Sequence, residues 1–170
     1  MNKLIVSNII RFFAVMLLQV LVFNYMNLFG FINPFVYLFF ILLLPFETPA
    51  WLLLVLAFFT GFSVDMFVNT GGIHAAATLA VGFARPILLR TLVSKREFET
   101  GIKPGVADLG WKWFVSYAGI SILIHSFIVF YLDALRISHF LETLRVALYQ
   151  AAATFFFIVL IEFVVNIRKR

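Results

Sequence analysis

GFSVDMFVNTGGIHAAATLAVGFARPILLR, the stretch at residues 61–90, places polar and ionisable side chains inside sequence that is otherwise strongly apolar. Asp65, His74 and Arg85 are the clearest examples. Such groups are expensive at membrane depth, so they normally face protein or water rather than lipid. We therefore expect this stretch to form the interior of the molecule.

The composition of the whole chain is that of a membrane protein. Of 170 residues, 64% are hydrophobic and 12% are charged, and the mean hydropathy is +1.06. These values lie outside the range of soluble globular domains. The chain has no cysteine, which excludes disulfides, thiolate metal sites and cysteine nucleophiles. The net charge of +5 comes from basic residues in short loops and at helix ends, which favours the positive-inside pattern over nucleic-acid binding.

The apolar runs predict a single membrane domain, an all-α bundle of six transmembrane helices. A crossing needs about 20 apolar residues. The second run is short and is bounded by Pro34 and Pro45, so five spans with one re-entrant arm are the alternative. The predicted spans are residues 9–29, 34–44, 50–68, 73–92, 111–132 and 144–167.

Basic residues orient these spans. They cluster near the start of the chain, in the loop at residues 93–110 and at residues 168–170. An even number of crossings places all three clusters on one side, which the positive-inside rule identifies as the cytoplasm. The sequence thus predicts a multi-pass protein with both termini in the cytoplasm. The loop at 93–110 is either a solvated connector or a docking surface for a cytoplasmic partner.

The turn between the third and fourth spans is the first candidate site. Gly61 and Asp65 are one helical turn apart, and Gly71 and Gly72 belong to a predicted tight turn. Asp65 could brace this turn or pair with His74, contact a partner protein, or take part in catalysis or ion coupling. We favour the structural role.

Small residues form the second candidate site, a stripe down the fourth span at Gly72, Ala76, Ala80 and Ala84. Small stripes let helices approach closely in lipid. The stripe could pack inside this chain's own bundle or receive the transmembrane helix of a partner. Arg85 follows it, and we expect Arg85 and Arg90 to snorkel to the cytoplasmic interface.

Catalytic patterns are weak, so we expect no enzymatic activity, cofactor or metal. Ser63 lies in GFSVD, which differs from a G-x-S-x-G nucleophile elbow at its last position and falls in a membrane helix. His74, His125 and His139 lie on separate elements without metal-binding spacing. Ser121 and His125 share a helix face, and we expect them to hydrogen-bond across helices.

The run from Asn33-Pro34 through Pro45 to GFSVD and then TGGIHAAAT resembles the rod shape-determining protein MreD family, and its phenylalanine-rich style is similar to members from Bacteroidetes. The resemblance covers about a third of the chain, residues 33–90. It implies a non-catalytic scaffold of the cell-elongation machinery, or elongasome, in the bacterial inner membrane. Such a protein would bind MreC and link the MreB cytoskeleton to the peptidoglycan synthases of cell wall biogenesis. Residues 61–90 would then serve as a structural hub or partner-binding surface.

The MreD fold is thought to be similar to the S-component of energy-coupling-factor transporters, and this supplies an alternative function. A vitamin-binding S-component should present a polar pocket that opens outward. The outer ends of the spans do not offer the tryptophan-rich cage expected for a flat vitamin. They do offer polar side chains: Asp65, Asn69, His74, Asp133 and His139. We therefore rank the scaffold first, the binder second and an enzyme third.

Overall fold

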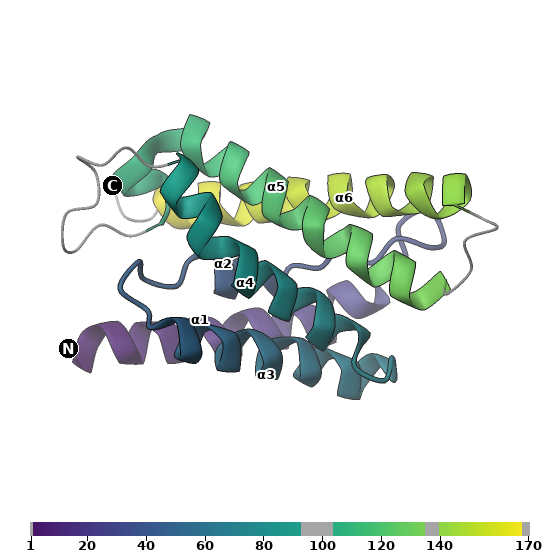
Figure 1. Cartoon of the computed structure of the whole chain (residues 1–170), viewed down its shortest axis with the longest axis horizontal. Coiled ribbons are helices and arrows are strands. Elements are labelled where there is room, and N and C mark those ends of the chain that lie inside the picture. Colours follow the sequence, from purple (N-terminus) through teal and green to yellow (C-terminus); the bar gives the residue numbers. More distant parts are fainter. Residues whose placement is uncertain (1, 93–103, 135–139, 168–170) are drawn as a thin grey trace.

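A computed structural model describes residues 2–92, 104–134 and 140–167, and the regular elements within these residues are helical (Figure 1). Five helices in this part of the chain are long and apolar enough to cross a membrane. The protein is therefore a multi-pass helical membrane protein. The five are α1 (Asn2–Leu21), α3 (Ala50–Val68), α4 (Ile73–Leu92), α5 (Val106–Ala134) and α6 (Phe140–Ile167).

The long helices pack mainly on their neighbours in sequence. Helix α3 packs on α4, α4 on α5, and α5 on α6. Helix α1 instead contacts the short helices η1 (Phe23–Tyr25) and α2 (Leu38–Leu42), and it touches α3 weakly. The start of α1 and the end of α6 lie at the same end of the bundle (Figure 1).

Two helices have the bounds predicted from their apolar runs, and the others differ. Helices α3 and α4 match residues 50–68 and 73–92. Helix α1 begins at Asn2 and ends at Leu21, not at residue 29; η1 (Phe23–Tyr25) and a loop in which Asn27 and Phe29 have positive φ angles follow it. Helix α6 begins before residue 144, and α5 begins before a helix break at Gly110 (φ 78°, ψ 168°).

The predicted second span has an unexpected form. Residues 34–44 contain only the five-residue helix α2, flanked by turns and irregular backbone, where the sequence predicts a transmembrane helix. The segment lies in the core: Phe35 to Leu42 and Leu44 are each at most 8% exposed. In Figure 1 it returns the chain through the bundle from the end of α1 to the start of α3. Irregular backbone at membrane depth is tolerated where protein buries it.

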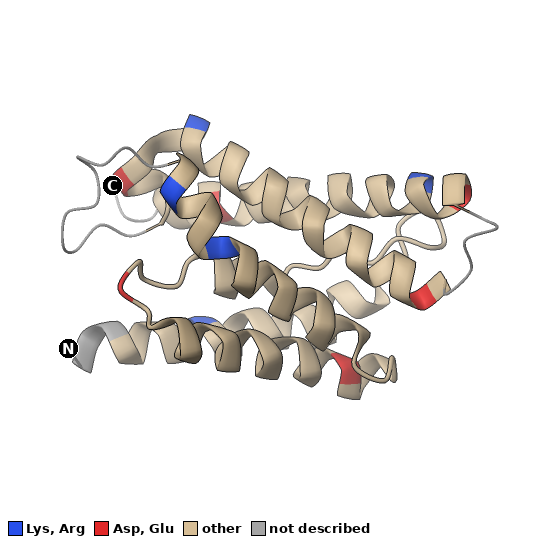
Figure 2. Cartoon of the chain, viewed as in Figure 1, with Lys and Arg blue, Asp and Glu red and all other residues tan. Residues whose placement is uncertain are grey.

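Charged residues gather toward the two ends of the bundle and leave between them a band with few charges (Figure 2). The end where α1 begins also holds the end of α4, with Arg90, and the start of α5, with Lys112. The opposite end holds Asp65 near the end of α3, Asp133 near the end of α5, and Glu142 and Arg145 near the start of α6. Such a band is the pattern expected of a chain that has lipid as its solvent around the middle.

Candidate functional site

The start of the irregular segment, at residues 33–37, is held by amide and hydroxyl side chains from the surrounding helices. Gln19 of α1 does this twice: its Oε1 accepts from the backbone N of Tyr37 at 3.1 Å, and its Nε2 donates to the carbonyl of Pro34 at 3.1 Å. On the other side, Thr154 of α6 accepts from the backbone N of Phe35 at 3.0 Å. Gln150, one turn earlier on α6, donates to the carbonyl of Asn33.

The other end of this segment is held by cationic and phenolic donors. The carbonyl of Leu42 accepts from Tyr117 Oη at 3.2 Å, and the carbonyl of Leu43 accepts from Arg11 Nη1 at 3.0 Å. The carbonyl of Leu44 accepts from Arg85. Each unpaired backbone group in hydrocarbon costs roughly several kcal/mol, so these side chains make the irregular segment possible. The six side chains are those of Arg11, Gln19, Arg85, Tyr117, Gln150 and Thr154.

Arg85 corrects a prediction. The sequence places it near the cytoplasmic end of α4, where we expect it to snorkel, but its side chain is 1% exposed. It donates through Nε to Tyr117 Oη at 3.0 Å as well as to the carbonyl of Leu44. The carbonyl of Leu44 holds the guanidinium inside the bundle, because a buried carbonyl outside a regular helix needs a hydrogen-bond donor from elsewhere. Arg90, further along α4, is exposed.

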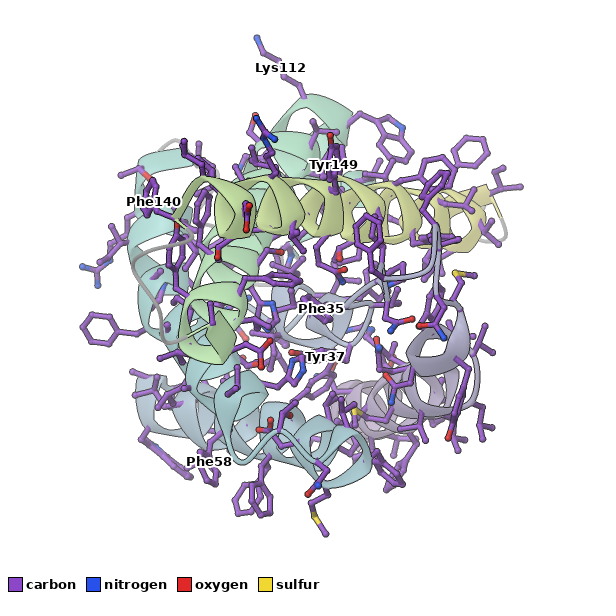
Figure 3. The ribbon with its side chains drawn as sticks, turned by 90° about the vertical axis from the view of Figure 1, so that its right-hand side faces the viewer. Phe35, Tyr37, Phe58, Lys112, Phe140 and Tyr149 are labelled. Carbon is purple, nitrogen blue, oxygen red and sulfur yellow. The ribbon has the colours of Figure 1, made fainter. Side chains whose placement is uncertain are left out.

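Tyr37 lies at the centre of the bundle and joins two histidines. Its Oη is 2.9 Å from His74 Nδ1 on α4 and 2.6 Å from His125 Nε2 on α5. Phe35 places its ring edge-on to both imidazoles, at centroid distances of 5.1 and 5.2 Å. Figure 3, which looks along the bundle, shows Phe35 and Tyr37 inside the ring of helices, whereas Phe58 and Tyr149 point outward.

The central cluster has a constrained proton arrangement. A phenol has one O–H to donate and accepts through its lone pairs, so one of the two histidines must donate to Tyr37. The other ring nitrogen of His125, Nδ1, is buried without a hydrogen-bond partner in the described structure. An N–H at Nδ1 would leave a buried donor unpaired. The arrangement in which His125 Nε2 donates to Tyr37, and Tyr37 donates to His74, avoids this cost.

The prediction that Ser121 and His125 bond away from their own helix is right for one of them. His125 bonds to Tyr37 outside α5, whereas Ser121 donates to the carbonyl of Tyr117 within α5 at 2.9 Å. Ser63 likewise donates to the carbonyl of Phe59, one turn earlier, at 2.7 Å. Among the described residues no group of three or more histidine or acidic side chains could hold a metal ion. His139 lies outside the described residues.

Asp65 connects α3 to the start of α4. Its Oδ1 accepts from the hydroxyl of Thr70 at 2.5 Å and from the backbone N of His74 at 3.0 Å, and its Oδ2 accepts from the backbone N of Ala75 at 2.8 Å. The first N–H groups of a helix have no partners within it, and a carboxylate there also complements the helix dipole. Asp65 therefore braces the turn, as predicted, but through the backbone of His74 and not through its ring.

The turn itself uses glycine where other residues are strained. Gly71 and Gly72 have φ angles of +63° and +103°, a region that side chains with a Cβ rarely adopt. Nothing lies within 4 Å of the position of a Cβ at either residue. Conformation rather than space therefore favours glycine at these positions.

The stripe predicted on α4 lies beside the buried face of that helix. Ala76 is exposed, and Gly72, Ala80 and Ala84 are half-buried. The close contacts with α3 are made one or two positions away from the stripe, where Ala75 approaches Gly61 and where Gly82 approaches Ala57. A groove of about 470 Å³ runs between α3 and α4 near their turn. It is lined by residues that include Gly72, Ala76, Phe58, Phe62 and Met66.

The central residues of the site are absent from the sequence-based candidates. Tyr37, Gln19, Gln150, Thr154 and Tyr117 each sit in an apolar run. Polar side chains at membrane depth normally face protein, and this signal could have identified Gln19 and Gln150. Most of the predicted loop at 93–110 lies outside the described residues, which resume at residue 104.

Comparison with known proteins adds no relative. No protein-family model matches the chain, and no curated protein or solved structure matches it.

Proposed function

We propose that this protein is a non-catalytic membrane scaffold of the MreD type. It binds a single-pass MreC-like protein and links an MreB-like cytoskeleton to peptidoglycan synthesis. The resemblance of residues 33–90 to that family supplies the identity of the partners. The observation that carries the choice of a scaffold over a small-molecule binder is structural: the centre of the bundle is filled by the chain's own residues 34–44.

A filled centre is a poor site for a vitamin. Phe35 and Tyr37 occupy the space between α4, α5 and α6, and their polar atoms are bonded within the chain. Admitting a ligand there would break hydrogen bonds that the irregular backbone needs. A hollow between the loop that follows α1 and helix α6, beside Phe29 and Tyr149, measures about 550 Å³ and is lined mainly by apolar side chains. It lacks the convergent polar groups that orient a small ligand.

The groove between α3 and α4 is the surface that we assign to the partner. Small residues at Gly72 and Ala76 let a helix backbone come close, and aromatic side chains at Phe58 and Phe62 flank it. Phe62 and Met66 are 42% and 71% exposed. In lipid such a surface gains from close packing with another helix, which suits a single-pass partner.

We further propose that both termini face the cytoplasm of a bacterial inner membrane. This is supported by the common end of α1 and α6 and by the basic residues there. The segment at 34–44 then makes the second of six crossings, although it is not a membrane-length helix. Reporter tags at the two termini should both be cytoplasmic, and a periplasmic tag at either end would contradict this topology.

Affinity purification from native membranes tests the proposal, with co-purifying proteins and bound small molecules both identified by mass spectrometry. The expected result is an MreC-like protein and no stoichiometric vitamin. Ala76→Leu should lower the recovery of the partner, because the larger side chain fills the groove without entering the bundle. Ala152→Leu is the matched control, since Ala152 is exposed on α6, far from α3 in sequence.

Two outcomes would overturn the proposal. Retention of a vitamin through purification would favour the transporter S-component. Equal recovery of the partner with both alanine variants would remove the groove from the binding surface.

A further inference from the structure

A second hollow, separate from the α3–α4 groove, opens at the end of the bundle where α1 begins. It measures about 600 Å³. Its walls come from α1, the irregular segment, the start of α5 and the last turns of α6. Helices α1 and α6 are not extensively packed on each other, and this hollow lies between them.

Opposite charges line this hollow. Arg11 comes from α1, Glu162 from α6 and Asp108 from the start of α5. Arg11 and Glu162 attract each other across the space, yet in the described part of the chain no ion pair joins them within 4.0 Å. Separated opposite charges beside a space of this size suit a ligand that carries both signs.

The cationic group has donors to offer such a ligand. Both hydrogen bonds that Arg11 makes with described residues use Nη1, which donates to the carbonyl of Leu43 and to Asn8 Oδ1, each at 3.0 Å. A guanidinium has five N–H donors in a fork that matches two oxygens of a phosphate. Arg11 is half-buried, so a phosphate bound there would be partly shielded from water.

The anionic group is held in place from one side. Glu162 Oε1 accepts from the backbone N of Val106 at 2.9 Å and from Asn166 Nδ2 at 2.8 Å. Both bonds that this carboxylate accepts within the described part of the chain end on Oε1, and a carboxylate has a second oxygen that can accept. The side chain is 4% exposed, so its charge needs partners.

From this arrangement we propose that the hollow binds the headgroup of a phosphatidylethanolamine molecule, with its phosphate on Arg11 and its ammonium on Glu162 and Asp108. Apart from Asn166, the remaining side chains of the lining, which include Ala14, Leu18, Ile161 and Val165, are apolar and suit the start of an acyl chain. Arg11 lies nine residues into α1, about 13 Å along the helix from its start. The first span is predicted to begin at residue 9, which places Arg11 near the headgroup layer of the adjoining leaflet.

Other headgroups fit less well. An anionic phosphatidylglycerol would bring its phosphate near two carboxylates and supply no cation. A phosphatidylcholine carries a cation without N–H groups, so it cannot hydrogen-bond to a carboxylate. The site should therefore prefer phosphatidylethanolamine over both.

Lipid retention by the purified full-length protein tests this proposal. The protein is incubated in detergent with equal amounts of phosphatidylethanolamine, phosphatidylcholine and phosphatidylglycerol of identical chains, and bound lipid is counted by native mass spectrometry. Arg11→Gln should lower retention of phosphatidylethanolamine about tenfold, the loss of a charged hydrogen bond. Glu162→Gln keeps an oxygen for Val106 and should reduce the preference over phosphatidylcholine. Ala14→Phe fills the hollow with its charges intact and should also lower retention.

Arg90→Gln is the control, because Arg90 is exposed at the same end of the bundle and does not line the hollow. Thermal unfolding of each variant separates loss of lipid from loss of fold. Equal retention of the three lipids by the wild type, or a preference for phosphatidylglycerol, overturns the proposal. So does an Arg90→Gln effect as large as that of Arg11→Gln, or full retention by a folded Ala14→Phe.

Discussion

Gly61 of α3 lies directly against the backbone of His74 at the start of α4. A Cβ added at Gly61 would come 2.4 Å from the carbonyl oxygen of His74 and 2.6 Å from the Cα of Ala75. Both neighbours are backbone atoms, which cannot move aside as the end of a flexible side chain can. The glycine therefore sets the spacing of the α3–α4 pair, and that spacing brings Asp65 within reach of the first N–H groups of α4.

Gly61→Ala should destabilise the protein, because the two helices must separate to admit the methyl group. Overpacking typically costs about 1–3 kcal/mol, and we expect the upper part of this range. Thermal unfolding in detergent measures the change. Gly119→Ala on α5 is the control, since its Cβ would meet Phe155 at an ordinary 3.7 Å. A Gly61→Ala protein as stable as Gly119→Ala would contradict the close approach.

Asp65→Ala should free three donors at once: the hydroxyl of Thr70 and the backbone N–H groups of His74 and Ala75. We expect a loss of about 4 kcal/mol or more of unfolding free energy, since each of the three hydrogen bonds to a charged group contributes roughly 1.5–3 kcal/mol. Asp65→Asn keeps one acceptor oxygen, so its unfolding free energy should lie between those of the wild type and Asp65→Ala.

Asp133→Ala is the matched control, because Asp133 is an exposed carboxylate toward the same end of the bundle. Protection of the α4 amides from hydrogen exchange should fall in Asp65→Ala and remain in Asp133→Ala. Equal stability of the two variants would show that the turn holds without its carboxylate.

Tyr37→Phe should leave His74 and His125 without their shared partner while keeping the aromatic ring in place. Leaving buried polar groups unpaired costs about 1–3 kcal/mol. Tyr149→Phe, which removes a phenol that is 58% exposed, should have little effect. Thermal unfolding again compares the two, and a neutral Tyr37→Phe would mean that the histidines find other partners.

The sequence predicted the parts of this fold that depend on local pattern. The apolar runs at 50–68 and 73–92 have the length of a membrane helix, and the helices α3 and α4 follow them. The turn between them was also predictable, because Gly71 and Gly72 permit a positive φ and Asp65 is a good partner for unpaired N–H groups.

The interior could not be predicted from local pattern. An apolar run such as 34–44 fits a helix or a buried irregular segment equally well, and the difference depends on residues far away in the chain. Gln19 and Thr154 supply hydrogen bonds that residues 34–37 need, yet they lie on α1 and α6. For the same reason the sequence predicts Arg85 at the interface, although the carbonyl of Leu44 and the hydroxyl of Tyr117, both far away in the chain, hold it inside.

Arg85→Lys tests whether this arginine holds the irregular segment. The lysine keeps the positive charge but lacks the planar fork that reaches Tyr117 and the carbonyl of Leu44 together. One partner should therefore lose its bond inside the bundle, which we expect to cost about 1–3 kcal/mol. Arg90→Lys, the same change at an exposed position on the same helix, should be neutral. An arginine that snorkels to the interface can be replaced by lysine without loss of stability. Equal thermal stability of the two variants would therefore contradict the buried role of Arg85. A loss of stability in Arg85→Lys alone would show that its two hydrogen bonds inside the bundle are needed.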